Sequence, residues 1–262
     1  MKLVDIGVNL TGKSFNNDKQ QVVDDAVKAG VEKIIVTGTT ELHSKKALAL
    51  AESRPDVLFA TAGIHPHHAS DFNAASIQVL ADLAAHKEVI AVGECGLDYN
   101  RNYSPRDDQL RCYESQLELA ADTGLPVFLH QRDAHEDFVE ILKRHRDKIS
   151  GGVVHCFTGT AIQMREYLEL DMHIGITGWI CDERRGHELQ KMVHEIPLNR
   201  LMIETDAPYL LPRAINPRPK SNRNEPKFLP LVCEAVATCM GLDVKQVGQA
   251  TTETANALFK LS

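Results

Sequence analysis

Short apolar runs alternate with helix-like segments along the whole chain. Eight of these runs are rich in aliphatic and β-branched residues and are expected to be strands: Leu3–Val8, Lys33–Thr37, Leu58–Gly63, Val89–Gly93, Pro126–His130, Gly152–Cys156, His173–Thr177 and Arg200–Glu204. This alternation is typical of parallel strands joined by right-handed crossovers. Eight such units in 262 residues match the roughly 250 residues of a (β/α)8 barrel. The sequence therefore predicts an α/β protein with one TIM-barrel domain over residues 1–262, although the strand count also allows a doubly wound open sheet.

Helix boundaries and connecting segments support one continuous domain. Ser104 followed by Pro105 predicts a helix N-cap and a first-turn proline, and Gly124 predicts the end of that helix. Gly30 similarly predicts the end of the first helix. The chain contains no linker rich in glycine and serine and no low-complexity tract, so nothing in it predicts a second domain.

Composition narrows the class of protein. A formal charge of −7 and a pI near 5.9 argue against a surface coated with basic residues for binding nucleic acid, but they leave room for a local basic groove. The six cysteines are scattered, with no CxxC pair, which favours reduced thiols in the cytosol. No signal peptide and no apolar stretch of about 18 residues is recognisable. These features predict a cytoplasmic enzyme that does not enter the membrane, and we expect a monomer with no obligate protein partner.

Four carboxylate and imidazole side chains follow predicted strands: Glu94, His130, His155 and Asp206. A β/α barrel gathers the carboxyl ends of its strands at one mouth, where such residues converge. Converging carboxylate and imidazole groups suit a divalent cation, so the pattern indicates a metal-assisted hydrolase. Taken singly, Glu94 could instead cap a helix or form an ion pair, and His130 could be a buried core histidine. Two histidines on adjacent strands favour the metal site.

Glu94 and Asp206 are the candidate catalytic residues. Gly93 and Gly96 flank Glu94 and are expected to let the backbone approach a ligand closely. Asp206 lies after the last predicted strand, where a carboxylate can accept a proton from a water molecule whose pKa a metal has lowered. Both residues are therefore predicted to bind the metal and to take part in the reaction.

Several residues are candidates for holding phosphate. His65 follows the third predicted strand and could donate to a phosphate oxygen, and Arg132 has the planar fork that binds phosphate through two bonds. A salt bridge from Arg132 to Asp133 or Glu136 is the alternative. The segment from Pro208 to Pro230 holds six prolines and these basic residues: Arg213, Arg218, Lys220, Arg223 and Lys227. A long loop over the barrel mouth is usually functional or disordered, so this one is either a phosphate clamp or a solvated connector.

The chain offers few aromatic side chains on which bases could stack. It has eight Phe, five Tyr and one Trp. Tyr99, Tyr209 and Trp179 lie near predicted strand ends and are the candidates, with packing as the alternative for each.

Seven blocks together resemble the TatD family of metal-dependent deoxyribonucleases. They are collinear and cover essentially the whole chain: Asp5–Leu10, Gly63–His67, Gly93–Asp98, His130–Ala134, His155–Gly159, Glu204–Tyr209 and Arg223–Pro226. The resemblance implies a TIM barrel, hydrolysis of phosphodiester bonds and metal ligands at Glu94, His130, His155 and Asp206. It also implies 3′-to-5′ exonuclease action on single-stranded DNA, and on RNA as an extension, in DNA repair or degradation with magnesium as the usual activator.

One block departs from the family pattern. Many relatives begin with Asp-x-His-x-His, and both imidazoles bind a second metal, whereas this chain has Gly7 and Asn9 at those places. Asn9 offers only a weak, neutral oxygen. Coordination rich in oxygen from Glu94, Asp206, Asn9 and water suits Mg²⁺ better than Zn²⁺, with Mn²⁺ and Zn²⁺ as alternatives. A mechanism with one metal, or with a second metal that arrives with the substrate, is the resulting hypothesis.

Two other functions remain open from the sequence alone. The same metal chemistry could hydrolyse an ester or amide, such as an aminoacyl-tRNA ester, although clustered phosphate donors favour a nuclease. A barrel that only binds a structural metal is the second alternative. Asp206 argues against it, because a purely structural site has no use for a proton acceptor.

Overall fold

The computed structural model describes residues 1–213, 215, 217, 219 and 221–261. It contains eight strands, all of which the sequence predicted: β1 (Leu3–Val8), β2 (Val31–Val36), β3 (Leu58–Ala62), β4 (Val89–Asp98), β5 (Val127–Arg132), β6 (Gly152–Val154), β7 (His173–Ile176) and β8 (Leu201–Ile203). Most boundaries differ from the prediction by two residues or fewer. The exception is β4, which continues five residues past Gly93 to Asp98, so that Glu94 lies inside a strand rather than after it. His130 lies inside β5, which continues two residues past it to Arg132.

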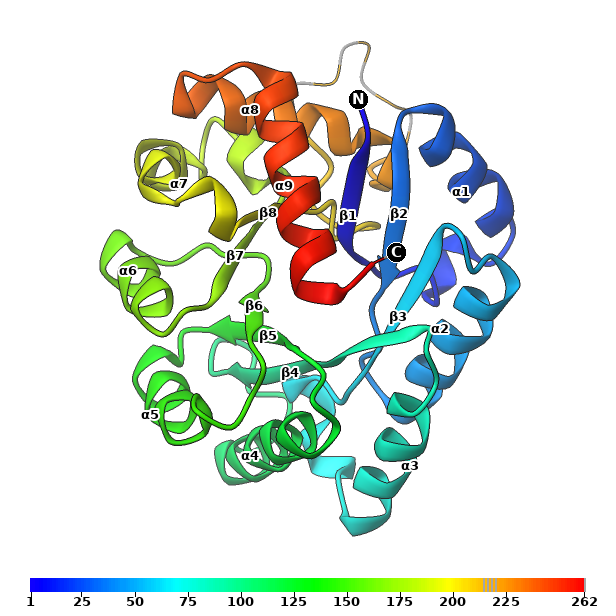
Figure 1. Ribbon diagram of the computed structural model, residues 1–262, viewed down its shortest axis with the longest axis vertical. Coiled ribbons are helices and arrows are strands. Elements are labelled where there is room, and N and C mark those ends of the chain that lie inside the picture. The colour runs from blue at the N-terminus through cyan, green and yellow to red at the C-terminus, as the bar shows by residue number, and fades with distance from the viewer. Residues whose placement is uncertain (214, 216, 218, 220, 262) are drawn as a thin grey trace. The chain divides into compact units, whose positions relative to one another are not determined.

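Helices connect the strands in chain order (Figure 1). Their bounds are α1 (Lys19–Lys28), α2 (Glu41–Ser53), α3 (Ala74–Ala84), α4 (Arg106–Thr123), α5 (His135–His145), α6 (Ala161–Glu169), α7 (His187–Met192), α8 (Leu229–Met240) and α9 (Val244–Phe259). The strand order is sequential from β1 to β8 in one eight-stranded sheet. A doubly wound sheet would reverse its strand order at a switch point, so the alternative of an open sheet is wrong. The fold is a (β/α)8 TIM barrel.

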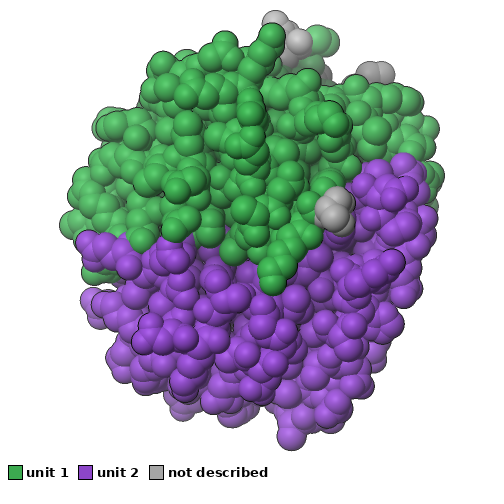
Figure 2. Space-filling view, viewed as in Figure 1, with its two compact units in different colours: residues 1–35, 156–168, 173–262 green, residues 36–155, 169–172 purple. Residues whose placement is uncertain are grey.

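Chain contacts group the residues into two compact units (Figure 2). Unit 1 comprises residues 1–35, 156–168 and 173–262, and unit 2 comprises residues 36–155 and 169–172. Within the part of the chain that the structure describes, no helix combines the length and the apolar character needed to cross a membrane.

In unit 1, strands β1 and β8 lie together. Asp5 on β1 is fully buried; its Oδ1 accepts a hydrogen bond from the Thr205 backbone N–H at 2.9 Å, and its Oδ2 accepts one from the Thr205 hydroxyl at 2.6 Å. Val8, the last residue of β1, pairs with Ala207 beyond β8 in a parallel bridge, and the Asn9 N–H donates to the Ala207 carbonyl at 2.8 Å. These bonds join the first strand to the last and position the segment that carries Asp206.

In unit 2, α4 begins one residue later than expected. Arg106 is its first residue, and Pro105 occupies the N-cap position without a side-chain cap. The predicted N-cap role of Ser104 is wrong, because its hydroxyl donates instead to the His67 carbonyl at 3.1 Å. The predicted end is confirmed, since Gly124 adopts the left-handed conformation with φ of 70°.

Candidate active site

Three imidazole groups in unit 2 converge on one oxygen of Glu94. Distances to Glu94 Oε1 are 2.8 Å from His155 Nε2, 3.1 Å from His130 Nδ1 and 3.3 Å from His65 Nε2. The four residues come from β4, β5 and the segments that follow β3 and β6. The structure thus brings together three of the four predicted metal ligands and adds His65, for which the sequence predicted a phosphate-binding role.

A bulge in β4 carries Glu94. The register with β5 shifts between Gly93 and Cys95, and the Glu94 N–H donates instead to the Gly38 carbonyl at 2.7 Å. A β-bulge redirects the side chain that it carries. Because Glu94 is taken out of the regular ladder, its carboxylate reaches the three imidazoles.

The glycines on either side of Glu94 serve strand packing rather than ligand access. Gly93 and Gly96 have φ angles of 137° and 140°, which L side chains rarely adopt. A Cβ atom on Gly93 would lie 2.2 Å from the Phe128 carbonyl oxygen, and one on Gly96 would lie 1.9 Å from that of His130. The sequence predicted that these glycines let a ligand approach. The structure gives a different reason for them: both allow β4 to lie close to β5.

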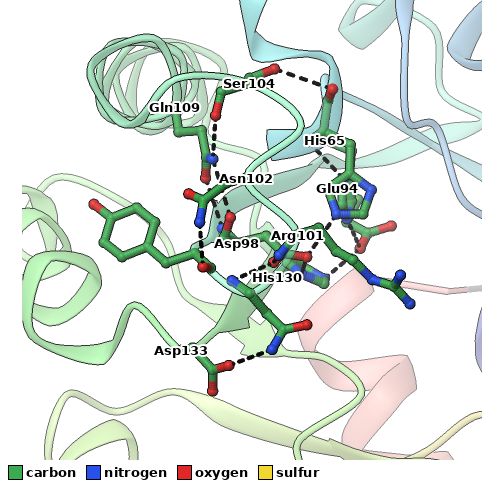
Figure 3. Close-up of polar contacts among 12 residues, drawn as sticks. His65, Glu94, Asp98, Arg101, Asn102, Ser104, Gln109, His130 and Asp133 are labelled. Carbon is green, nitrogen blue, oxygen red and sulfur yellow. Dashed lines mark hydrogen bonds and ion pairs between the residues drawn. The ribbon is translucent and has the colours of Figure 1, made fainter.

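A second carboxylate, Asp98, supports the cluster (Figure 3). Its Oδ2 lies 2.7 Å from His67 Nε2 and 3.3 Å from His130 Nε2. The His130 ring is therefore held between Glu94 and Asp98, one at each nitrogen. Such a carboxylate behind a metal-binding histidine fixes the ring orientation and the tautomer.

The electrostatics of the cluster suit a cation. Burial opposes ionisation of Glu94, but the imidazoles outweigh it and hold the pKa of this carboxyl well below its usual range. Burial lowers the pKa of His65 to about 4, although Glu94 acts in the opposite direction, so His65 is neutral near pH 7. For His130, burial lowers the pKa, but hydrogen bonds with Asp98 and Glu94 outweigh it and raise the value.

The donor set meets the requirements of a divalent metal. One ligand atom each from His65, Glu94 and His130 lies within 4.8 Å of the others. A carboxylate and imidazole nitrogens that converge in a largely buried site are ligands that divalent transition metals prefer, and a cation would displace any proton from the coordinating nitrogen. The residues present therefore fit a bound cation.

The predicted catalytic Asp206 lies in unit 1, where its neighbours hold it in place. Its backbone has φ of 54°, its N–H donates to the Gly7 carbonyl at 2.9 Å, and the Asn9 amide donates to its Oδ1 at 3.1 Å. Asn9 was predicted as a weak ligand for a second metal. The structure shows it as a hydrogen-bond donor that orients the Asp206 carboxylate.

Asn224 is a buried residue of unit 1 that the sequence analysis did not single out. It is fully buried, and its side-chain amide donates to the Thr205 carbonyl while its N–H donates to the Pro208 carbonyl, each at 2.9 Å. These bonds fasten the segment on both sides of Asp206. The signal available in the sequence was its place in the block Arg223–Pro226, which resembles the TatD family.

The predicted phosphate-binding residues have different surroundings. His65 faces Glu94, as described above, and its Nδ1 accepts from the His67 N–H at 3.1 Å. Arg132 is the last residue of β5, and its backbone lies opposite that of Asp98 in the register of β4 and β5. Arg223 forms two bonds with Asp18, at 2.7 and 3.0 Å, and others with the Ser14 carbonyl and Glu225. These contacts favour a structural role for the Arg223 guanidinium.

The basic loop after β8 is largely neutralised in the part that the structure describes. Arg213 pairs with Glu183 at 3.0 Å, and Lys227 pairs with Glu225 at 2.6 Å. Arg218 and Lys220 lie outside the described residues. Each described basic side chain of this loop therefore has a carboxylate partner, which weakens the case for a bare phosphate clamp.

The chain is similar to known proteins over its full length. Residues 4–260 match the family model of TatD-related DNases. A protein of Erwinia tasmaniensis named 3′-5′ ssDNA/RNA exonuclease TatD is 48% identical over 259 residues, which cover 99% of this chain and 100% of that protein. The protein of the same name from Erwinia amylovora is 49% identical over 259 residues, with 99% and 100% covered.

Solved structures agree in fold. A TatD homolog from Escherichia coli K12 superposes with a TM-score of 0.88 at 29% identity and covers 99% of this chain and 98% of its own. A TatD-family hydrolase from Entamoeba histolytica gives a TM-score of 0.89 at 24% identity, with 100% and 99% covered. At that identity the second structure supports the barrel fold alone.

Proposed function

The chain belongs to the TatD-related DNase family, and from this premise we propose that it is a metal-dependent 3′-to-5′ exonuclease acting on single-stranded DNA and RNA. Relatives with 46–49% identity over nearly the whole length carry that activity in their names. The observation that carries the proposal is the convergence of His65, His130 and His155 on the buried Glu94 carboxylate. Such a site assists hydrolysis of a phosphodiester, because a bound cation offsets the negative charge on the reacting phosphate.

In this proposal Glu94, His130 and His155 hold a divalent cation. His65 donates to a phosphate oxygen, because its Nδ1 accepts from the His67 N–H and its Nε2 therefore carries the proton of the neutral ring. When bound, the cation supplies Lewis-acid chemistry that polarises the phosphate and lowers the pKa of water. Asp206 stays the predicted further ligand and the proton acceptor for the attacking water. Asp98 positions His130 by accepting from the far side of its ring.

The types of donor atom indicate which metal ion the site favours. Magnesium is the expectation from the sequence, because Asn9 and Asp206 offer oxygen atoms. The imidazole-rich cluster of unit 2, with three nitrogens around one carboxylate, favours Mn²⁺ or Zn²⁺ instead. Metal analysis of the purified protein, followed by reconstitution of the chelated protein with each ion, decides between them.

A digestion experiment tests the activity. End-labelled single- and double-stranded DNA and single-stranded RNA are incubated with the protein and Mg²⁺, Mn²⁺, Zn²⁺ or chelator. We expect stepwise shortening from the 3′ end of single strands, abolished by chelator and by Glu94→Gln. Hydrolysis of acyl esters, including aminoacyl-tRNA, without any shortening of DNA or RNA would identify the alternative hydrolase and refute the proposal.

The remaining expectations concern the cellular setting. We propose one folding domain that acts as a monomer in the cytoplasm and takes part in DNA repair or degradation. None of the six cysteines, all of which the structure describes, forms a disulfide, which is compatible with a reducing compartment. Light scattering of the purified protein tests the monomer, and fractionation of cells that express it tests the location.

A further inference from the structure

An exposed aromatic ring lies beside the cluster in unit 2. Tyr103 is 65% exposed, and its ring centroid is 4.7 Å from that of His67, in an edge-to-face arrangement. His67 binds Asp98, and Asp98 binds His130. A single exposed aromatic residue is unremarkable on a protein surface, but this one touches His67, which two hydrogen bonds through Asp98 connect to the proposed metal ligand His130.

A cationic side chain lies two residues earlier in the same loop. The Arg101 backbone N–H donates to Asp98 Oδ1 at 2.8 Å, and its side chain is exposed. Its guanidinium makes no hydrogen bond or ion pair with any residue that the structure describes, whereas those of Arg111 and Arg223 are bound to carboxylates. In the view of Figure 3, the Arg101 side chain extends toward the part of the site that holds Glu94 and His65.

Side-chain hydrogen bonds support this loop, residues 99–104, at both of its ends. Gln109 is fully buried; its Oε1 accepts from the Asp98 N–H at 2.8 Å, and its Nε2 donates to the Asp98 and Ser104 carbonyls at 3.1 and 2.9 Å. The Asn102 amide donates to the Tyr99 carbonyl at 2.6 Å. A loop held in this way presents its exposed side chains without a large entropic cost on binding.

Of the aromatic residues that the sequence predicted for stacking, Tyr209 in unit 1 is 61% exposed, whereas Tyr99 and Trp179 are covered by neighbouring side chains. The Tyr99 hydroxyl donates to Asp137 at 2.6 Å, and the Arg106 guanidinium covers its ring at 4.1 Å. Arg185 covers the Trp179 ring at 4.2 Å. Tyr103 had no such signal in the sequence, because its position beside His67 depends on how the loop folds.

We propose that the loop of residues 99–104 binds one nucleotide of a single-stranded nucleic acid, with the base stacked on Tyr103 and a backbone phosphate bound by Arg101. Stacking on an aromatic ring tolerates every base, and a guanidinium recognises phosphate in any sequence. This is the recognition that a nuclease without sequence preference needs. The inference rests on the proposed function and adds a binding element that does not touch the reacting atoms.

A thermodynamic cycle between protein and substrate tests the base contact. KM is measured for single-stranded DNA with an abasic residue placed at each of the 3′-terminal positions in turn, for the wild type and for Tyr103→Leu. We expect Tyr103→Leu to raise KM for intact DNA about 5- to 100-fold, as for the loss of one stacked base, with kcat little changed. One abasic position should raise KM for the wild type by a similar factor and have no further effect on the variant.

Matched variants distinguish the loss of this contact from a general loss of stability or of positive charge. Tyr103→Phe keeps the ring and should behave as the wild type. Arg101→Gln should weaken the dependence of log KM on log salt by about 0.7, the value for one phosphate contact on a single strand, while Arg111→Gln, which removes an equal charge from α4, should leave it unchanged. Because both loop residues are exposed, the thermal midpoints of all variants should match that of the wild type.

The possible outcomes distinguish the two proposals. If the wild type degrades single-stranded DNA but Tyr103→Leu keeps its KM, or remains as sensitive to the abasic position as the wild type, the nucleotide-binding loop is refuted and the exonuclease stands. If the wild type degrades neither DNA nor RNA with any of the metals, the proposed function fails and the loop proposal fails with it.

Discussion

At the residue scale, Asp206 is the position where the proposed chemistry can be tested with least disturbance. Asn tolerates the left-handed backbone found there, with φ of 54°, and its Oδ1 can still accept from the Asn9 amide. It cannot accept a proton. We expect Asp206→Asn to lower kcat about 10²- to 10⁴-fold, the range for general base catalysis, with little change in KM. Steady-state kinetics on single-stranded DNA measure this, and near-normal turnover would remove Asp206 from that role.

Asp98 should control metal affinity through His130. Replacement by Asn keeps the shape but weakens the bonds to His67 and His130, so we expect Asp98→Asn to reduce the affinity for Mn²⁺ or Zn²⁺ about 10- to 100-fold. Calorimetric titration of the chelated protein gives the affinity. Asp133→Asn is the matched control, because Asp133 is exposed and, among the residues that the structure describes, its side chain binds only the Asn100 amide, at 2.7 Å. Equal affinities for the two variants would contradict the supporting role.

At this scale, the sequence could predict a site residue only where the residue type and its place next to an apolar run were both visible in a few consecutive residues. Glu94, His130 and His155 were predicted because each is a ligand residue at a strand end. Asp98 was missed because it lies four residues beyond Glu94 in a segment taken as loop, and only the continuation of β4 places both carboxylates on the cluster. His65 was predicted as a phosphate donor after the third strand, but its approach to Glu94, at 3.3 Å, depends on how β3 and β4 lie together and was not visible in the sequence.

At the element scale, the contact between β4 and β5 shapes the site, and Gly96 is its most constrained residue. A Cβ atom there would lie 1.9 Å from the His130 carbonyl oxygen. The two strands could relieve this clash only by moving apart, and His130 would then shift. We expect Gly96→Ala to lower the free energy of unfolding by about 3 kcal/mol or more and to impair metal binding. Urea unfolding and metal titration measure the two effects.

Gly124 provides the control for this substitution. It also has a positive φ, of 70°, but no atom lies within 4 Å of where its Cβ would be. Gly124→Ala should therefore cost only the backbone strain, about 1 kcal/mol, and leave metal binding intact. A similar loss of stability in both variants would mean that the strand approach at Gly96 is less tight than the structure shows.

Element boundaries followed the sequence where a local signal fixed them. Gly124 ended α4 as predicted, and all eight strands formed, because hydrophobic runs and glycine caps act over a few residues. The extension of β4 past Gly93 and the start of α4 at Arg106 were not predictable in that way. Both depend on distant partners: the β5 backbone in the first case, and His67, which binds Ser104, in the second.

At the scale of the whole molecule, stability depends on the hydrogen bonds that join β1 to the segment after β8. Two of these bonds are made by the buried carboxyl group of Asp5. Burial raises the pKa of Asp5 to about 8, against the hydrogen bonds from Thr205 and Gly7, which lower it. The folded protein therefore keeps Asp5 protonated at pH values where the unfolded chain, with a pKa near 3.9, has lost the proton. Because the folded state binds more protons in this window, Asp5 reduces stability as the pH rises.

The sign of this effect gives a prediction for unfolding. Between about pH 4 and pH 8 the Asp5 contribution to the free energy of unfolding should fall by up to about 1.4 kcal/mol per pH unit, and it should level off above the folded pKa. Asp5→Asn copies the protonated form: its oxygen accepts from the Thr205 and Gly7 N–H groups, and its amide donates to the Thr205 hydroxyl oxygen. Urea unfolding of both proteins at pH 5, 6, 7 and 8 isolates the contribution, because the other titrating groups are shared. The wild type should lose stability relative to Asp5→Asn at each step. Parallel curves would show that Asp5 is ionised in the folded protein and that its three hydrogen bonds outweigh its burial.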